Sequence, residues 1–242
     1  MDLRAEESGW ERLAPGVARR RLPRWDATAG LVHGPSAALL VDAGATLAEG
    51  RSLRAGAQEL LDGLPAPSSV THLALTHPHF DHVLGAAAFP EAESYGAVGF
   101  TVDGRRELVA DAVRHGLAPE AAEEAARLLR PPRHPVSGAV TLDLGGGREA
   151  VLANIGPGHT AHDLVVLVPG TPPVVFCGDL VEESGEPQAG PDAVPSRWPA
   201  ALDRLLALAG EEALYVPGHG AVVDAGFVRS QRARLARRFG AS

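Results

Sequence analysis

The sequence predicts a mixed α/β fold in which helices cover a core of two β-sheets. Both halves of the chain contain apolar, β-prone runs followed by a segment with helical spacing, an order that suits two sheets between layers of helix. Hydrophobic residues make up 45% and charged residues 21% of the 242 residues, which is ordinary globular composition. We therefore expect a single domain over residues 1–242.

The first strands are predicted to form a hairpin. Residues 31–33 and 37–41 are apolar and β-prone, and the Gly-Pro-Ser stretch between them is typical of a turn. The second strand of the pair ends at Asp42. Helical spacing of apolar residues follows over 53–64, and another strand begins at Val70.

A histidine-rich segment, residues 76–82, follows this strand. Asp81 within it is expected to cap a helix that ends before Pro90. Residues 103–134 are then predicted to be an inserted pair of helices, because they are rich in alanine and glutamate and end in a cluster of prolines.

The next part of the chain is mainly strand. Residues 140–144 and 150–152 flank a turn of three glycines, which indicates a second hairpin. Residues 164–168 and 174–177 are continuous apolar runs, as expected for strands covered on both faces. The stretch 183–195 is rich in Gly, Pro and Ser and is predicted to be a surface loop.

The last elements alternate again between helix and strand. Ser196 is expected to cap a helix over 197–208, in which Pro199 is acceptable because it lies in the first turn. A short strand over 213–216 leads into Pro217-Gly218-His219-Gly220. A final helix carries many arginines.

Bulk properties exclude several classes of protein. The acidic segment 1–7 lacks an apolar stretch, so no secretory signal is expected, and no apolar run reaches membrane-spanning length. One cysteine, Cys177, forbids an internal disulfide and fits a reducing compartment, so we expect a cytoplasmic protein. A homodimer is left open as the oligomeric state. The net charge of -8 argues against a broad nucleic-acid surface.

Two local groups of arginines interrupt this acidic balance. We interpret both as solvated structural faces rather than as sites that capture an anion. They are Arg19, Arg20, Arg21 and Arg24 near the start, and Arg229, Arg232, Arg234, Arg237 and Arg238 near the end.

The segment 76–82 is the strongest indication of chemistry in the chain. In an extended segment His77 and His79 project to the same side and can chelate one ion. Asp81 and His82 lie slightly further along, where they can hold a second ion. Imidazole with carboxylate suits zinc, and also iron or manganese.

Three further polar residues follow apolar strands, each beside a glycine. They are His159, Asp179 and His219. Glycine permits the tight turns and close approach that a ligand cluster gathered from several strand ends requires.

This ordered set, with Asp42 ending an earlier strand, resembles the metallo-β-lactamase superfamily, and its motifs span roughly residues 42 to 219. The resemblance implies a four-layer αββα sandwich with two metal ions, most readily zinc, at one edge between the sheets. It implies that His77, His79 and His159 hold the first ion and that Asp81, His82 and His219 hold the second. Asp179 would bridge the two ions. Asp42 would hold the ligand loop by hydrogen bonds without touching metal.

Two divalent ions held this close can share a water and lower its pKa, which makes hydroxide available at neutral pH. We expect the bridging hydroxide to attack an ester-type bond in a small-molecule substrate, while Asp81 orients it and passes a proton to the leaving group. In this superfamily a bridging aspartate such as Asp179 is typical of glyoxalase II-like thioesterases, lactonases and phosphodiesterases rather than of true β-lactamases. A thioester or ester is therefore the leading substrate class.

Other activities remain open at this point. A mononuclear iron dioxygenase acting on a persulfide would keep His77, His159 and Asp179 as ligands. Lactonase or phosphodiesterase activity is a second alternative, although Leu180-Val181-Glu182 follows Asp179 where lactonase-like members place a tyrosine. A non-catalytic metal-binding module is a third.

The remaining histidines and Cys177 are expected to be structural. These histidines are His33, His72, His115, His134 and His162, of which His162 is the one expected nearest to the site. The predicted helical insertion and the loop over 183–198 are expected to read the substrate, with Phe80, Leu180 and Trp198 as candidate pocket walls.

Overall fold

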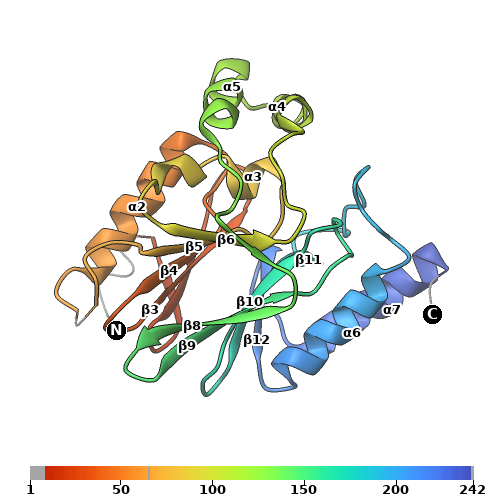
Figure 1. The fold of residues 1–242 in the computed structure, drawn as a ribbon. Coiled ribbons are helices and arrows are strands. Elements are labelled where there is room, and N and C mark those ends of the chain that lie inside the picture. The colour runs from red at the N-terminus through yellow and green to blue at the C-terminus, as the bar shows by residue number, and fades with distance from the viewer. Residues whose placement is uncertain (1–8, 65, 241–242) are drawn as a thin grey trace.

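The computed structural model describes residues 9–64 and 66–240. The acidic segment 1–7, on which the expectation about a secretory signal depends, lies outside these residues. Figure 1 shows two β-sheets stacked face to face between helices, which is the predicted mixed α/β architecture.

The first sheet has seven strands in the order β1-β2-β3-β4-β5-β6-β7. They are β1 (Glu11–Ala14), β2 (Val17–Arg21), β3 (Thr28–His33), β4 (Ala38–Val41), β5 (His72–Ala74), β6 (Glu93–Ala97) and β7 (His134–Val136). Pairing is antiparallel from β1 to β4 and parallel from β4 to β7. The predicted hairpin is confirmed as β3 and β4, with Leu31 opposite Leu40.

The second sheet has five strands in the order β12-β11-β10-β9-β8. They are β8 (Ala139–Gly145), β9 (Arg148–Asn154), β10 (Leu164–Val168), β11 (Val174–Glu182) and β12 (Leu214–His219). The glycine turn between β8 and β9 is confirmed, and Gly146 and Gly147 both adopt positive φ, 61° and 78°, as tight hairpin turns of this kind require. Only the last pair, β11 with β12, is parallel in this sheet.

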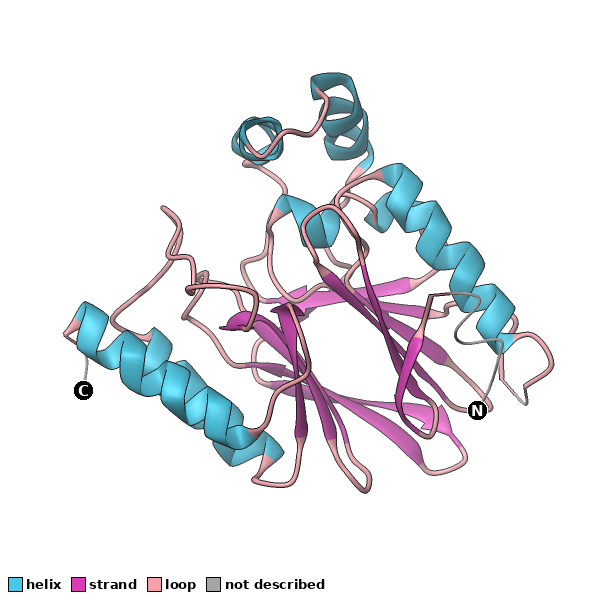
Figure 2. Ribbon diagram, turned by 180° about the vertical axis from the view of Figure 1, so that it is seen from behind, coloured by secondary structure: helices cyan, strands magenta, loops and turns pink. Residues whose placement is uncertain are grey.

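Helices complete the four layers. They are α2 (Leu47–Leu61), α3 (Phe80–Val83), α4 (Arg105–Arg114), α5 (Pro119–Leu128), α6 (Trp198–Ala209) and α7 (Ala225–Phe239), with a 3₁₀ turn, η1, at Ala86–Ala88. Figure 2 shows α2 on the outer side of one sheet, and α6 with α7 on the outer side of the other. Three apolar clusters match these layers: one under α2 and α3, one between the sheets, and one under α6 and α7.

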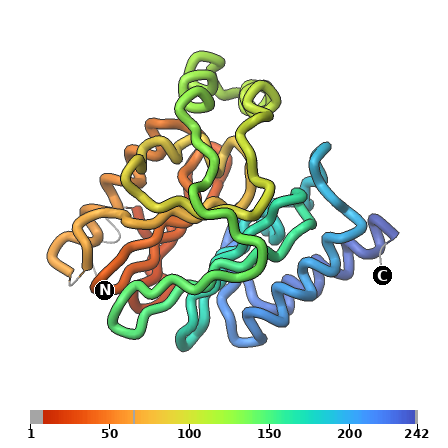
Figure 3. The backbone as a smooth tube through the Cα atoms, viewed as in Figure 1, coloured from red at the N-terminus to blue at the C-terminus, as the bar shows by residue number. Residues whose placement is uncertain are grey.

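The inserted helices are present as α4 and α5. The chain leaves the first sheet after β6, passes through both helices and returns as β7, as the tube in Figure 3 shows. Ala112, Ala122 and Ala125 of the pair are fully buried in the cluster that also contains Phe80 of α3. None of the helices in the described part of the chain is both long and apolar enough to cross a bilayer.

Two predicted caps are wrong. His79, not Asp81, is the N-cap of α3, because the Asp81 carboxylate turns toward Nε2 of His219 at 3.3 Å. Arg197 precedes α6 with no side-chain cap, and the start of that helix is instead tightened by a turn in which Trp198 N donates to Pro195 O.

Helix α2 begins at Leu47 rather than at residue 53. Thr46 Oγ1 accepts a hydrogen bond from Glu49 N at 3.0 Å, and Glu49 Oε2 accepts one from Ala45 N at 2.7 Å. This arrangement resembles a capping box, except that Glu49 reaches the N–H of Ala45, one residue before the N-cap Thr46. The Thr-x-x-Glu pattern is visible in the sequence and locates the true start of the helix.

Candidate metal centre

The seven side chains proposed as ligands lie together at one edge of the sandwich. They form two groups of potential ligand atoms: His77, His79, His159 and Asp179 in the first, and Asp81, His82 and His219 in the second. Asp179 and His219 also form a third group with Glu182, which the sequence analysis did not propose. The turn between β5 and α3, helix α3 itself, the turn between β9 and β10, and strands β11 and β12 supply them. Leu164 N donates to Thr76 O at 2.8 Å, which ties the two sheets together beside the site.

Asp179 lies between the two groups. Its Oδ2 is 3.6 Å from His77 Nε2, 3.5 Å from His159 Nε2 and 3.3 Å from His219 Nε2. Its Oδ1 is 3.2 Å from His82 Nε2. Asp179 lies within β11 rather than at a strand end, at a point where the pairing of β11 with β12 becomes irregular. This irregularity directs its carboxylate toward both groups of histidines.

Each of the five histidines has its other ring nitrogen engaged outside the cluster. His82 Nδ1 lies 2.9 Å from Asp42 Oδ2, and His79 Nε2 lies 3.0 Å from Asp192 Oδ2. The other three histidines also have an oxygen atom within hydrogen-bond distance of Nδ1. His159 Nδ1 faces Gln188 O, His219 Nδ1 faces Trp25 O, and His77 Nδ1 faces Thr76 Oγ1. Carbonyl and carboxylate oxygens only accept, so these outer nitrogens carry the hydrogen and the inner nitrogens can present lone pairs.

The inward-facing atoms need a cation. His79 Nδ1 and His159 Nε2 face each other at 2.9 Å, and His82 Nε2 and His219 Nε2 at 3.4 Å. His77 Nε2 and Asp179 Oδ1 are buried without a hydrogen-bond partner. Nitrogen lone pairs and carboxylates at these separations repel one another unless positive charge lies between them. Imidazole and carboxylate ligands in this number fit divalent zinc, iron or manganese.

Burial and charge perturb the ionisation of the cluster in opposite directions. Burial lowers the pKa of His159 to about 4, so its ring stays neutral. Burial also disfavours a charged His219, but Asp179 and Asp81 outweigh it and raise the pKa of His219 to about 12. In the first group burial also lowers the pKa of His77, whereas at His79 burial is outweighed by the contact with Asp192, which raises the pKa. In the second group a proton competes with metal for His219.

Asp42 forms hydrogen bonds to the segment 76–82 on the side away from the cluster. Its Oδ1 accepts from Thr76 N and its Oδ2 from Thr76 Oγ1, both at 2.8 Å, while Oδ2 also contacts His82. Asp42 adopts φ of 59°, a left-handed conformation that aspartate tolerates better than most residues. Because the Thr76 hydroxyl donates to Asp42, it must accept from His77 Nδ1, which orients that ring as well.

Two residues of the loop between β11 and α6 support the first group. The carboxylate of Asp192 faces His79, and the carbonyl of Gln188 faces His159. Sequence analysis missed both, because 113 residues separate Asp192 from His79 and no motif links them. Helix α6 adds support through Trp198, whose ring packs edge-on against His159 at 5.3 Å between centroids.

The N-terminal strands support the second group in a similar way. The Trp25 carbonyl faces His219, and Ala27 forms a single β-bridge with His219. Arg19 of β2 is buried, and its Nη1 donates to Gly220 O at 3.0 Å while its Nε donates to Glu11 at 2.7 Å. The arginine thus holds the turn that carries His219.

Gly218 is required for the close approach of β11 and β12 at this point. A Cβ atom at residue 218 would lie 1.8 Å from Asp179 Oδ1, far closer than van der Waals contact between carbon and oxygen allows. Any larger residue would therefore displace the carboxylate that joins the two groups.

The model of the metallo-β-lactamase superfamily matches residues 22–219 of the chain. The chain belongs to this superfamily. Metallo-beta-lactamase domain-containing protein 1 of Xenopus laevis is 30% identical over 199 residues, covering 81% of this chain and 71% of that protein. A hydroxyacylglutathione hydrolase of Cupriavidus metallidurans is 41% identical over 61 residues, covering 24% of this chain and 23% of that enzyme.

Solved structures show the same fold. A metallo-β-lactamase of Pontibacter korlensis superimposes with a TM-score of 0.69 at 21% identity, covering 93% of this chain and 97% of that chain. A metallo-β-lactamase of Pseudomonas aeruginosa, solved in a mono-zinc form, superimposes with a TM-score of 0.67 at 21% identity and covers 95% of this chain and 94% of that chain. The four-layer αββα sandwich predicted from the motifs is thereby confirmed.

Other predicted residues of this superfamily member lie outside the cluster. The histidines at 33, 72, 115, 134 and 162 belong to none of the ligand groups among the described residues, and His162 Nδ1 faces Val98 O. Burial raises the pKa of the Cys177 thiol, and Sγ donates to Val175 O at 3.4 Å, as a structural cysteine would. Phe80, Leu180 and Trp198 are at most 4% exposed, so they pack behind the site and are not pocket walls.

Several arginines of the two groups, expected to be solvated, pair with carboxylates of this chain. Arg21 pairs with Asp26, Arg229 with Glu211 and Arg232 with Asp203. Arg24 donates to Gly116 O at the end of the α4 helix and stacks over the ring of Trp25.

Metal binding should release protons, and the apparent affinity should rise with pH through the neutral range. The reason is that the pKa of His219, about 12 without metal, keeps a proton on a ring that must bind metal as a neutral ligand. Zinc titration of the metal-free protein in weak buffer, followed with a pH indicator, measures the release. An affinity independent of pH would contradict this assignment of His219.

Asp192→Asn should weaken binding of one metal ion about 10–100-fold, because His79 loses the carboxylate that orients its ring. Chelator competition with the cobalt-loaded protein, monitored by absorbance, resolves the two ions. Asp203→Asn is the matched control, since that carboxylate pairs with Arg232 on the surface of α6 and α7.

Arg19→Met should weaken metal binding at the group that contains His219 by a similar factor. The reason is that the turn with His219 and Gly220 loses the hydrogen bond from the buried Arg19. Glu11, which would lose its partner, is 57% exposed, so the substitution leaves no buried charge behind. If Asp192→Asn and Arg19→Met weaken the same ion, the two supports are not separate.

Proposed function

We propose that this protein is a hydrolase that uses two divalent metal ions, most readily zinc, to cleave a thioester or ester bond in a small molecule. The observation that carries the proposal is the position of Asp179, whose two carboxylate oxygens lie within 3.6 Å of inward nitrogens from both groups of histidines. A single carboxylate placed in this way suits a bridge between two ions.

Bound metal ions would supply a water of lowered pKa and a Lewis acid for the substrate oxygen. The protein supplies orientation. Asp81 Oδ2 lies 3.3 Å from His219 Nε2 and 3.7 Å from His82 Nε2, so the carboxylate borders the second group. From there Asp81 can accept a hydrogen bond from the attacking water and return a proton to the leaving group. No side-chain nucleophile is required, and the buried Cys177 thiol is not available for that role.

The substrate class is supported by two observations. Asp179 places a carboxylate between the groups, a feature that the sequence resemblance associates with thioesterases, lactonases and phosphodiesterases. The match to a hydroxyacylglutathione hydrolase, whose name describes a thioester substrate, favours thioesters among these, although it covers 24% of this chain.

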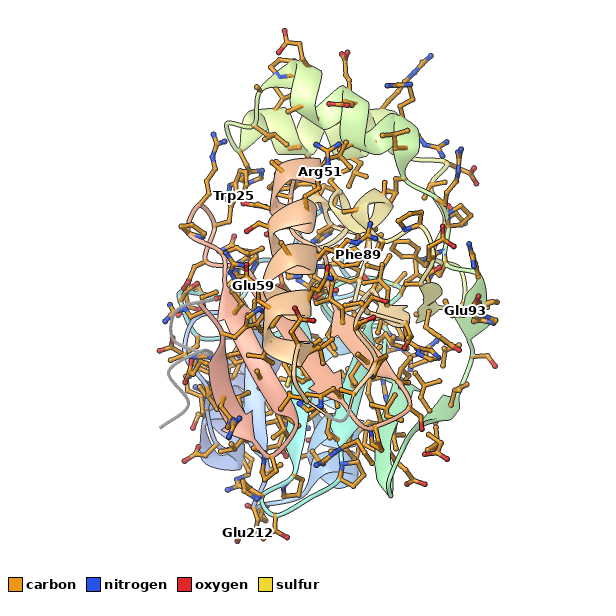
Figure 4. All side chains as sticks on the ribbon, turned by 90° about the vertical axis from the view of Figure 1, so that its left-hand side faces the viewer. Trp25, Arg51, Glu59, Phe89, Glu93 and Glu212 are labelled. Carbon is orange, nitrogen blue, oxygen red and sulfur yellow. The ribbon has the colours of Figure 1, made fainter. Side chains whose placement is uncertain are left out.

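The loop between β11 and α6 and the Trp25 segment are the proposed borders of the substrate site. Asp192 is 46% exposed at its side chain while it contacts the ligand His79, so this loop reaches the solvent side of the cluster. The half-buried Trp25 packs edge-on against Phe80 at 5.2 Å, and Figure 4 shows it directly below the helical pair. An apolar acyl group would find a partly exposed aromatic surface there.

Native protein should contain about two metal ions per chain and should hydrolyse thioesters or esters faster than lactones, phosphodiesters or β-lactams. Elemental analysis, coupled to a substrate panel, measures both. One tightly held iron with oxygen consumption on a persulfide would overturn the proposal in favour of a dioxygenase.

Asp81→Asn should lower kcat/KM for the best substrate about 10²–10⁴-fold, because the amide cannot accept and return the proton. His79→Ala should abolish activity with loss of metal, whereas Asp203→Asn should leave both unchanged. If His79→Ala keeps full activity, this cluster is not the active site.

A further inference from the structure

A groove of about 600 Å³ runs between α4 and α5, away from the metal centre. The helical pair projects from the top of the sandwich in Figures 1 and 4, and no residue of the groove belongs to the metal cluster. This volume lies within the range of small-molecule sites, about 300–1,000 Å³. The residues that line it include Arg106, Val109, Val113, Glu123, Arg127 and Arg130.

The groove has a basic end and an apolar end. Arg105 Nε donates to Ala126 O at 2.9 Å and Arg105 Nη2 to Leu129 O at 3.0 Å, so the start of α4 lies beside the end of α5. Arg106, Arg127 and Arg130 therefore gather at this end. Val113 and Pro119, at the other ends of the two helices, make the opposite end apolar.

The basic end carries positive charge that the protein itself does not neutralise. Arg106, Arg127 and Arg130 are exposed, and they form no hydrogen bond or ion pair among residues 9–64 and 66–240. Glu123 is the single acidic residue lining the groove. Arginines elsewhere, such as Arg229 and Arg232, pair with carboxylates in this chain of net charge -8.

Helix electrostatics account for only part of this pattern. Arg127 lies in the last turn of α5, where a cation is favourable. Arg106 lies in the first turn of α4, where a cation is unfavourable, and it has no compensating contact of the kind that Arg105 makes. An anion bound between Arg106, Arg127 and Arg130 would remove this local repulsion.

We propose that the α4–α5 groove binds an anionic amphiphile: a carboxylate held by Arg106, Arg127 and Arg130, with an acyl chain lying over Val109 and Val113. Residues 105 and 113 of α4 are separated by about 12 Å along the helix axis, which suits a medium-length acyl chain. Val113 is 36% exposed, so the apolar floor is open to such a chain. The site stands independently of the proposed hydrolase activity, because it shares no residue with the metal cluster.

Calorimetric titration of the metal-loaded full chain with decanoate tests the site. Decanoate should bind at about one molecule per chain and at least about tenfold more tightly than decanol, which lacks the charge, or acetate, which lacks the chain. Equal affinity for decanoate and decanol, or no saturable binding of decanoate, would overturn the proposal.

Variants locate the binding on the helical pair. The double substitution Arg106→Gln with Arg130→Gln should weaken decanoate about tenfold or more, and Val113→Ser should weaken it through the chain. Both changes are at exposed positions, so the fold should persist, which circular dichroism checks. Arg237→Gln, at an exposed position on α7, is the matched control and should leave the affinity unchanged. Unchanged binding in the double variant would place the ligand elsewhere and contradict the proposal.

Discussion

The burial of one carboxylate among histidine rings is the constraint on which the centre of this structure depends. Asp179 lies within 3.6 Å of nitrogens from His77, His82, His159 and His219, in a place almost closed to solvent. Such a concentration of ligand atoms is unfavourable unless a cation fills it and every outer hydrogen-bonding group is satisfied. The surrounding fold meets the second condition in detail, because each ring has an oxygen partner behind it.

Those partners come from two different parts of the chain. Arg19 of β2 and Trp25, in the turn between β2 and β3, hold the side of the centre that contains His219. Asp192 and Gln188, in the loop before α6, hold the side that contains His79 and His159. The two proposed metal positions therefore have separate supports, and a change in the loop before α6 can act on one without altering the other. This loop is also a proposed border of the substrate site, which would place substrate recognition and ligand orientation on the same segment.

Local sequence patterns predicted the elements whose causes are local. The hairpin of β3 and β4, the glycine turn of β8 and β9 and the inserted helices α4 and α5 all follow from turn residues or apolar spacing. The strands β1, β2, β6 and β7 were not predicted. Strand β2 contains three consecutive arginines, Arg19 to Arg21, and it forms part of the sheet because the buried Arg19 finds partners in the exposed Glu11 and in the Gly220 carbonyl. Strand β6 is polar and contains Gly96, and its pairing with β5 and β7 defines it.

The sequence by itself determined which residues gather at the candidate metal centre. Histidine and aspartate at close spacing, with further copies beside glycines after apolar strands, have few other uses than metal binding, and the structure brings all seven together. Only the tertiary structure decided how these residues are held. The roles of Thr76, Asp192, Gln188, Trp25 and Arg19, the burial of Phe80 and Trp198, and the displacement of Asp81 from its expected cap all depend on contacts between segments distant in the chain. The physical reason is that the type of side chain determines whether a residue can bind a metal ion. The neighbours that the fold packs against the side chain determine its orientation.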